Sequence, residues 1–269
     1  MSLVFAAIAP HGSLPEAPVP GADKTHEALE ELGRRFEAAH PEATIVLTPH
    51  NVHVEGHFAV VLAGTLEGRL AELDAPEVEL SCPVDLGLAT QVVLALHDAD
   101  VPVVGASFGA NDPSAATAPM DWGVLIPLWF MGGRSEPQVP AVVISPARDL
   151  SVEEHVRAGR ALARAAAESG KRVALIASAD HGHAHDPKGP YGFHPAAAEY
   201  DERVVELVRE NRLGGLLELG PDLVQTAKAD SWWQMLMLHG ALGDGWRGDF
   251  LSYEASTYFG MLCAAYAPN

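Results

Sequence analysis

The sequence predicts an α/β fold: a single domain with a largely parallel central sheet that is flanked by helices. Short continuous apolar runs, typical of strands buried on both faces, occur at 3–9, 44–48, 101–104, 139–145 and 172–177. Helical patterns separate several of these runs, and such alternation is typical of parallel sheets. The 269 residues show no linker composition. We therefore assign residues 1–269 to one domain.

The helices are predicted from apolar spacing and from one capping motif. Residues 23–39 carry Ala28, Leu29, Leu32 and Phe36 at helical spacing. The sequence Ser151-Val152-Glu153-Glu154 is a capping box that begins a helix ending near residue 169. Further helices are expected at 83–99, 195–211 and 221–242. Residues 52–62 are expected to form one or two strands, and residues 106–120 a loop over the site. Residues 250–265 are expected to be the closing segment of the fold.

The composition excludes several classes of partner. The formal net charge is −19, from 36 acidic and 17 basic residues, and no basic cluster exists that could meet nucleic acid or an anionic membrane. No apolar run of about 18 residues is present, so no membrane-spanning helix is expected. The only cysteines, Cys82 and Cys263, are interpreted as small buried apolar residues. Without a recognisable signal peptide, a cytoplasmic location is expected.

Three histidines follow predicted strands at equivalent positions. His11, His50 and His183 each lie just beyond the carboxyl end of an apolar run. Ligands of open α/β sheets bind at these ends, so three parallel strands would bring the imidazoles together. A single histidine after a strand is more often a loop or core residue, but the repeated placement favours a metal pocket. The sequence His181-Gly182-His183-Ala184-His185 could also be a metal-binding tract.

Several motifs in this order resemble those of the class III extradiol ring-cleaving dioxygenases, and in particular the catalytic subunit of protocatechuate-type enzymes. They are Pro10-His11-Gly12, Thr48-Pro49-His50, Met120-Asp121-Trp122-Gly123 with Pro127-Leu128, Ser178-Ala179-Asp180-His181-Gly182-His183, and Gly189-Pro190-Tyr191-Gly192-Phe193-His194-Pro195 followed by Glu199-Tyr200-Asp201. The resemblance extends over nearly the whole chain. The order and spacing of the motifs are more specific than any one of them.

The resemblance implies a metal site made of two histidines and one carboxylate. The matching histidines are His11 and His50. The family's carboxylate lies at the start of a late helix that leads into a Gly-Ala pair, here Gly240-Ala241, and the acidic residue at that place is Asp230. Several relatives carry Glu there, and an Asp at a helix start is usually an N-cap, so Glu254 is the alternative ligand.

The resemblance also assigns catalytic and substrate-binding residues. His183 matches the family's acid–base catalyst. His181 is the alternative for that role, or else a residue that supports the site from outside the cavity, and Asp180 could orient one of the two imidazoles. Asp121, Trp122 and His194 are assigned to substrate binding. Several relatives have Asp-His-Gly where this chain has Asp121-Trp122-Gly123. This difference points to a different or more apolar substrate or to an altered reaction, unless Trp122 only packs beside the pocket.

Two more histidines, His53 and His57, follow the His50 turn and could either approach the pocket or face solvent.

The implied activity is non-haem Fe(II)-dependent opening of a catecholic or aminophenol-type ring with O₂. Zn or Mn could replace iron, and a zinc-dependent hydrolase or a metal-binding scaffold protein is the alternative interpretation. The expected partners are the small aromatic substrate and O₂. On family grounds we expect a homo-oligomer, and some relatives also need a small accessory subunit.

Overall fold

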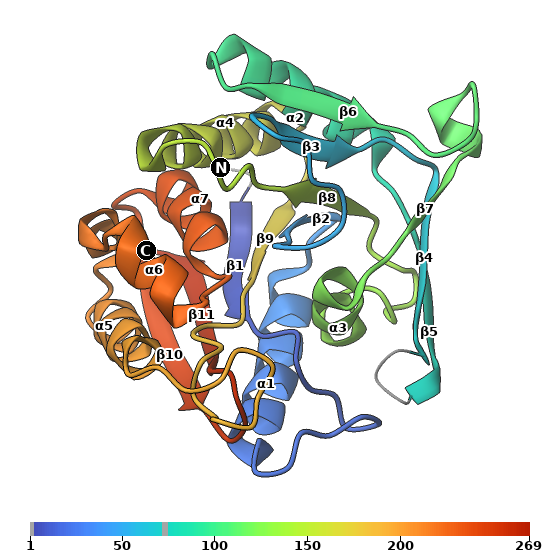
Figure 1. Cartoon of the computed structure of the whole chain (residues 1–269). Helices are drawn as coiled ribbons and strands as arrows, with labels where there is room; N and C mark the ends of the chain where they lie inside the picture. Colours follow the sequence, from blue (N-terminus) through green and yellow to red (C-terminus); the bar gives the residue numbers. More distant parts are fainter. Residues whose placement is uncertain (1–2, 72–74) are drawn as a thin grey trace.

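The computed structural model of the protein describes residues 3–71 and 75–269, which form two β-sheets and the helices around them (Figure 1). The larger sheet has eight strands in the order β10-β11-β1-β9-β2-β8-β3-β6. These strands are β1 (Leu3–Ala9), β2 (Ala43–Leu47), β3 (Phe58–Val61), β6 (Val103–Ala106), β8 (Ala141–Ser145), β9 (Val173–Ser178), β10 (Trp246–Glu254) and β11 (Met261–Pro268). The smaller sheet has the order β5-β4-β7, with β4 (Thr65–Leu70), β5 (Ala75–Pro83) and β7 (Thr117–Pro119).

The centre of the larger sheet is parallel, which confirms the predicted fold class. Strand β9 pairs in parallel with both β1 and β2, and β2 pairs in parallel with β8. The flanking strands reverse direction, because β11 is antiparallel to β1 and β3 is antiparallel to β8. The carboxyl ends of β1, β2 and β9 therefore meet at one edge of the sheet.

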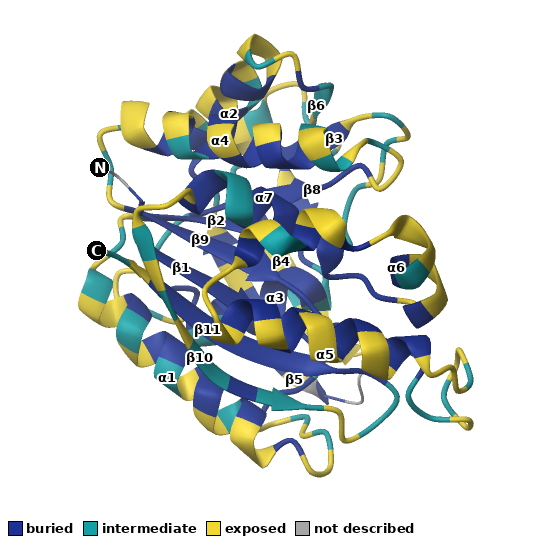
Figure 2. Cartoon of the chain, turned by 90° about the vertical axis from the view of Figure 1, so that its left-hand side faces the viewer, coloured by how far each residue is buried: buried dark blue, intermediate teal, exposed yellow. Residues whose placement is uncertain are grey.

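Helices cover both faces of this sheet. They are α1 (Asp23–Ala39), α2 (Leu86–Asp98), α3 (Trp122–Phe130), α4 (Val152–Glu168), α5 (Ala196–Arg209), α6 (Pro221–Ala227) and α7 (Trp232–Leu242), with the 3₁₀ turns η2 (Pro113–Ala115) and η3 (Leu213–Glu218). Alternate residues of β1 enter opposite cores: Ala6 and Ile8 pack with α2, α4, α5 and α7, whereas Phe5 and Ala7 pack with α1 and α3. Figure 2 shows buried strands between helices whose outer faces are exposed.

The hairpin of β4 and β5 was not predicted. Its residues do alternate, since Leu66 and Leu70 are buried while Glu67 and Arg69 are exposed. Helix α3 was missed because its nine residues are almost entirely buried and show no amphipathic pattern. In the predicted strand region 52–62 only Phe58–Val61 forms a strand, and the predicted loop 106–120 contains η2 and β7.

The helix predicted over 221–242 is in fact two helices. Lys228 adopts a left-handed conformation, with φ 56° and ψ 33°, and ends α6, and α7 begins only at Trp232. Residues 228–231 thus form a break between the two helices. Asp230 lies in this break rather than within a continuous helix.

Other features agree with the sequence. The capping box at Ser151 and Glu154 is present, and both cysteines are free and buried. Among the described residues, no helix is long and apolar enough to cross a membrane.

Candidate metal centre

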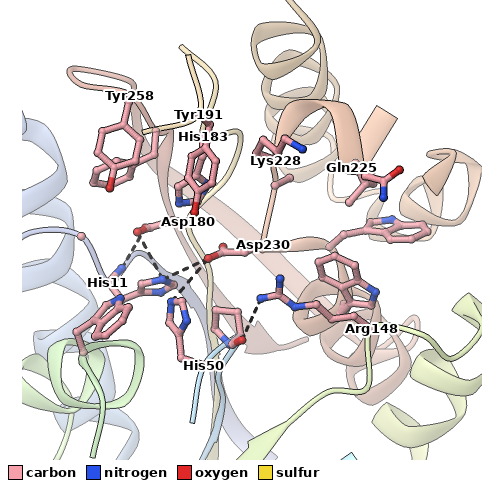
Figure 3. A pocket seen from close by; sticks show the side chains of 18 of the residues that line it. His11, His50, Arg148, Asp180, His183, Tyr191, Gln225, Lys228, Asp230 and Tyr258 are labelled. Atoms are coloured by element: carbon pink, nitrogen blue, oxygen red, sulfur yellow. Dashed lines mark hydrogen bonds and ion pairs between the residues drawn. The ribbon is translucent and has the colours of Figure 1, made fainter. Parts of the chain in front are cut away.

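His11, His50 and Asp230 come together at the carboxyl edge of the parallel strands. His11 follows β1, His50 follows β2, and Asp230 enters from the break between α6 and α7 (Figure 3). The Oδ2 atom of Asp230 lies 3.7 Å from His11 Nε2 and 3.8 Å from His50 Nε2. One ligand atom from each of the three residues lies within 4.8 Å of the others, so together they are placed to hold a metal ion.

The hydrogen bonds of His11 leave its Nε2 atom as the ligand atom. Ser178 donates its hydroxyl proton to the carbonyl oxygen of Gly123 at 2.5 Å. Its oxygen can therefore only accept from His11 Nδ1, which is 2.9 Å away. The imidazole is thereby fixed with a proton on Nδ1 and with Nε2 directed at Asp230. Such an outer hydrogen bond is typical of metal-ligating histidines.

The turn that carries His50 is held by its neighbours. The His50 ring packs against Trp122, with centroids 4.5 Å apart, and against His11 at 5.1 Å. A Cβ atom on Gly123 would lie 3.0 Å from the His50 ring and 2.6 Å from Thr48 Oγ1, so only glycine leaves the turn undisturbed.

The charges at this site are strongly coupled. Burial lowers the pKa of His11, but Asp180, Asp230 and Asp121 outweigh it and raise that pKa to about 9. Burial, assisted by the nearby positive charge of His11, lowers the pKa of His50 to about 3. Burial alone would raise the pKa of Asp230, but the surrounding histidines outweigh it and lower it. The raised pKa favours a proton on His11 Nε2 at neutral pH, and a metal ion that binds there would have to displace it.

Metal affinity should therefore increase with pH. Because the folded pKa of His11 is raised to about 9, its proton competes with the metal throughout the neutral range. We expect the apparent affinity for Zn²⁺ to increase about tenfold per pH unit from pH 6 to 8.5, measured by competition with a chelator of known proton affinity. Asp180→Asn should weaken this dependence, since the charge of Asp180 is the largest single cause that raises the pKa of His11. A flat profile in the wild type would contradict the assignment.

His183 lies beside the three ligands with its basic nitrogen available. Its Nδ1–H donates to the carbonyl oxygen of His181 at 2.7 Å, so the lone pair is on Nε2. Its ring stacks on Phe259, with centroids 5.6 Å apart, and lies about as close to Tyr258 and Tyr191. This histidine lines the same cavity as the metal ligands.

The cavity is large, with a volume of about 1120 Å³. His11, His50, Asp180, His183 and Asp230 lie on its wall, together with Trp122. Its lining also includes Arg148, Lys228, Gln225, Asp222, Trp232 and Trp233. In Figure 3, Arg148, Lys228 and Gln225 lie on one side of Asp230, and Tyr191 and Tyr258 lie on the other.

The other residues assigned from the sequence lie around the cavity rather than on its wall. Asp121 accepts a hydrogen bond from the side chain of Asn51 at 2.9 Å and so supports the His50 turn. His181 is fully buried and does not line the cavity. His194 is exposed and outside the lining. The structure therefore does not bring these three side chains to the cavity surface.

Glu254 belongs neither to the group of His11, His50 and Asp230 nor to the cavity lining. Its Oε2 atom accepts hydrogen bonds from the backbone N–H and the hydroxyl of Thr25, at 2.8 and 2.9 Å, and so fixes the start of α1. Of the two histidines after His50, His53 lines the cavity, and His57 is exposed with its Nδ1 atom 3.0 Å from the carbonyl oxygen of Glu55.

Several cavity residues were not identified from the sequence. Tyr258 and Phe259 come from the turn between β10 and β11, where no periodic pattern marks them. Arg148 follows β8, and its position beyond a parallel strand was the available signal. Lys228 could not be identified without knowing that α6 ends at that residue.

Comparison with known proteins places the chain in a family. The family described as the catalytic LigB subunit of aromatic ring-opening dioxygenase matches residues 6–262. The chain belongs to this family. The LigB-family assignment agrees with the resemblance found in the sequence.

Two further proteins are similar to this LigB-family chain. Protein CA_C1420 of Clostridium acetobutylicum (strain ATCC 824) is 22% identical over 236 residues, which are 87% of this chain and 50% of that protein. The chain thus spans about half the length of this relative. The crystal structure of the uncharacterized protein JW3007 from Escherichia coli K12 has a TM-score of 0.63 and 19% identity, covering 97% of this chain and 99% of that one. This second likeness concerns the fold.

Proposed function

We propose that this LigB-family protein is a non-haem Fe(II)-dependent extradiol dioxygenase that opens a catecholic or aminophenol-type ring with O₂. The observation that carries the proposal is the convergence of His11, His50 and Asp230 on the wall of a cavity that also contains His183. Two histidines and one carboxylate with open positions are the ligand set of non-haem Fe(II) oxygenases. When bound, the ion would supply the Lewis-acid and redox chemistry of the reaction.

In this proposal the base is His183. Its Nε2 lone pair can take a proton from a ring hydroxyl, while its Nδ1–H stays bonded to the His181 carbonyl. The same nitrogen can return the proton as the ring opens. Because the rings of Tyr191, Tyr258 and Phe259 surround His183, they would pack on the substrate and exclude water from the proton transfer.

Two cationic side chains of the cavity lining, Arg148 and Lys228, favour a substrate whose ring is negatively charged. Arg148 donates to the carbonyl oxygen of Pro49 at 2.9 Å, and its guanidinium lies over Trp233 at 4.8 Å. Lys228 lies on the same wall, and within residues 3–71 and 75–269 neither cation forms an ion pair with a carboxylate. A ring that has lost one hydroxyl proton is negatively charged. Such a ring would be attracted to this part of the cavity.

Oxygen consumption tests the proposal directly. The protein is loaded anaerobically with Fe(II) and mixed with a panel of catechols and aminophenols in an oxygen electrode, while the near-ultraviolet spectrum is recorded. We expect one O₂ consumed per ring opened and a new yellow product, because both oxygen atoms enter the product. The Zn²⁺-loaded protein should show neither change. No uptake with any substrate, despite stoichiometric Fe(II), would contradict the proposal.

The alternative is a zinc-dependent hydrolase or a metal-binding scaffold. The same ligand set also suits Zn²⁺. Trp122 packs against His50, whereas several relatives carry histidine at that position. This difference from the relatives is what favours the alternative for this chain. The Zn²⁺-loaded protein, assayed on ester and amide substrates, would then be the active form.

A further inference from the structure

Ser231 occupies the N-cap position of α7 but does not cap the helix. Serine is a preferred N-cap residue because its oxygen accepts from the first free backbone N–H groups. Here the residue has helical angles, φ −86° and ψ −22°, and its side chain forms no cap hydrogen bond. Its hydroxyl lies instead 2.9 Å from His181 Nδ1 and 2.9 Å from the hydroxyl of Tyr200. The side chain next to Asp230 is therefore turned toward the loop after β9.

The three members of this hydrogen-bond chain are fully buried. Ser231, His181 and Tyr200 have no exposed surface and come from the α6–α7 break, the loop after β9 and α5 respectively. A buried polar group that loses its partner is costly, so such a chain fixes the elements that contribute to it. Ser231 is thus held from two sides by segments distant in sequence.

Asp230 depends on its neighbours for its orientation. Its Oδ1 atom has no hydrogen-bond partner within residues 3–71 and 75–269. Its Oδ2 atom lies 3.7 Å or more from the histidine nitrogens that it faces as a ligand. Among the described residues the carboxylate is thus oriented by no hydrogen bond, so the backbone on either side of it must contribute to its orientation. On one side is Lys228 in its left-handed conformation, and on the other is Ser231.

We infer that His181 and Tyr200 are positioning residues of the metal centre, which hold the Asp230 carboxylate opposite His11 and His50 through Ser231. This inference rests on the metal binding in the proposed function. It also explains why His181 is buried: its side chain positions a metal ligand, while its carbonyl oxygen orients the base, His183. Because His183 contacts the main-chain carbonyl of His181, a substitution of the His181 side chain keeps that contact and tests only the contact with Ser231.

Metal affinity of variants tests the inference. Ser231→Ala and His181→Leu should each weaken Zn²⁺ binding about 10- to 100-fold, as outer-shell substitutions do, measured by competition with a chromophoric chelator. Tyr200→Phe removes only the hydroxyl at the end of the hydrogen-bond chain and should cause a smaller loss of Zn²⁺ affinity. His181→Asn keeps a polar atom near the position of Nδ1 and should recover most of the affinity. The double variant Ser231→Ala/His181→Leu should be no weaker than the worse single variant.

Two matched controls separate positioning from general stability. Ser252 and Tyr266 are also buried and do not line the cavity, so Ser252→Ala and Tyr266→Phe should bind Zn²⁺ like the wild type. The melting temperature of each metal-free variant is measured in parallel. If Ser231→Ala and Tyr200→Phe melt earlier but bind Zn²⁺ with unchanged affinity, the inference is wrong.

If His181→Leu does not fold, the Zn²⁺ affinities of Ser231→Ala and Tyr200→Phe decide the question alone. Metal-loaded wild type that consumes no O₂ would contradict the proposed function but not this inference.

Discussion

Asp230→Asn is expected to lower the affinity for Zn²⁺ and Fe²⁺ by at least about 100-fold, more than the loss of an outer-shell residue. The substitution keeps the size of the side chain and removes the negative charge that faces His11 and His50 at 3.7 and 3.8 Å. Oxygen uptake should be lost with the metal. The measurement is chelator competition for each ion, followed by oxygen uptake at saturating Fe(II).

Glu254→Gln is the decisive comparison for this prediction. The sequence offers Glu254 as the alternative ligand, but in the structure its carboxylate accepts hydrogen bonds from Thr25 at the start of α1. We expect this variant to keep wild-type metal affinity and to lose some stability, because a glutamine accepts these hydrogen bonds less strongly than a carboxylate. Normal metal binding by Asp230→Asn together with loss in Glu254→Gln would reverse the assignment.

The sequence was sufficient to predict the parallel centre of the fold and the place of His11 and His50 at its carboxyl edge. Strands buried on both faces appear as continuous apolar runs, and a residue just beyond such a run must lie at the carboxyl edge of the sheet. That argument placed His11 and His50 correctly, and it needs no knowledge of strand order. Strand order itself could not be predicted, because β9 is inserted between β1 and β2 only through long crossovers.

The positions of the carboxylate and of several other cavity residues depend on structure that sequence patterns do not show. Asp230 is near the histidines only because α6 ends at Lys228, and no Gly or Pro within residues 228–231 marks that break in the sequence. Tyr258 and Phe259 reach His183 because the β10–β11 hairpin brings its turn there. In the same way, two histidine candidates only two residues apart have opposite environments: His183 lines the cavity and His181 is buried.

His183→Asn should lower kcat by about 10²- to 10⁴-fold, the range for the loss of a general acid–base catalyst, and leave metal affinity unchanged. An asparagine amide can still donate to the His181 carbonyl from near the position of Nδ1, so the loop should keep its conformation. What it lacks is the basic Nε2 atom. The measurements are Zn²⁺ affinity, the Kd of a catechol for the Zn²⁺-loaded protein, and steady-state oxygen uptake with Fe(II).

His57→Asn is the matched control, because His57 also places its Nδ1 atom near a carbonyl oxygen two residues earlier, that of Glu55 at 3.0 Å, but lies outside the cavity. It should retain full activity. If His183→Asn loses metal or substrate binding as well as rate, His183 contributes to the site's structure rather than to proton transfer alone. If its rate is unchanged, the proton is handled elsewhere, and Asp180, buried beside His11 on the same wall, becomes the next residue to test, since burial raises its pKa above the ordinary value. The binding and rate measurements together therefore distinguish a base from a residue that only shapes the cavity.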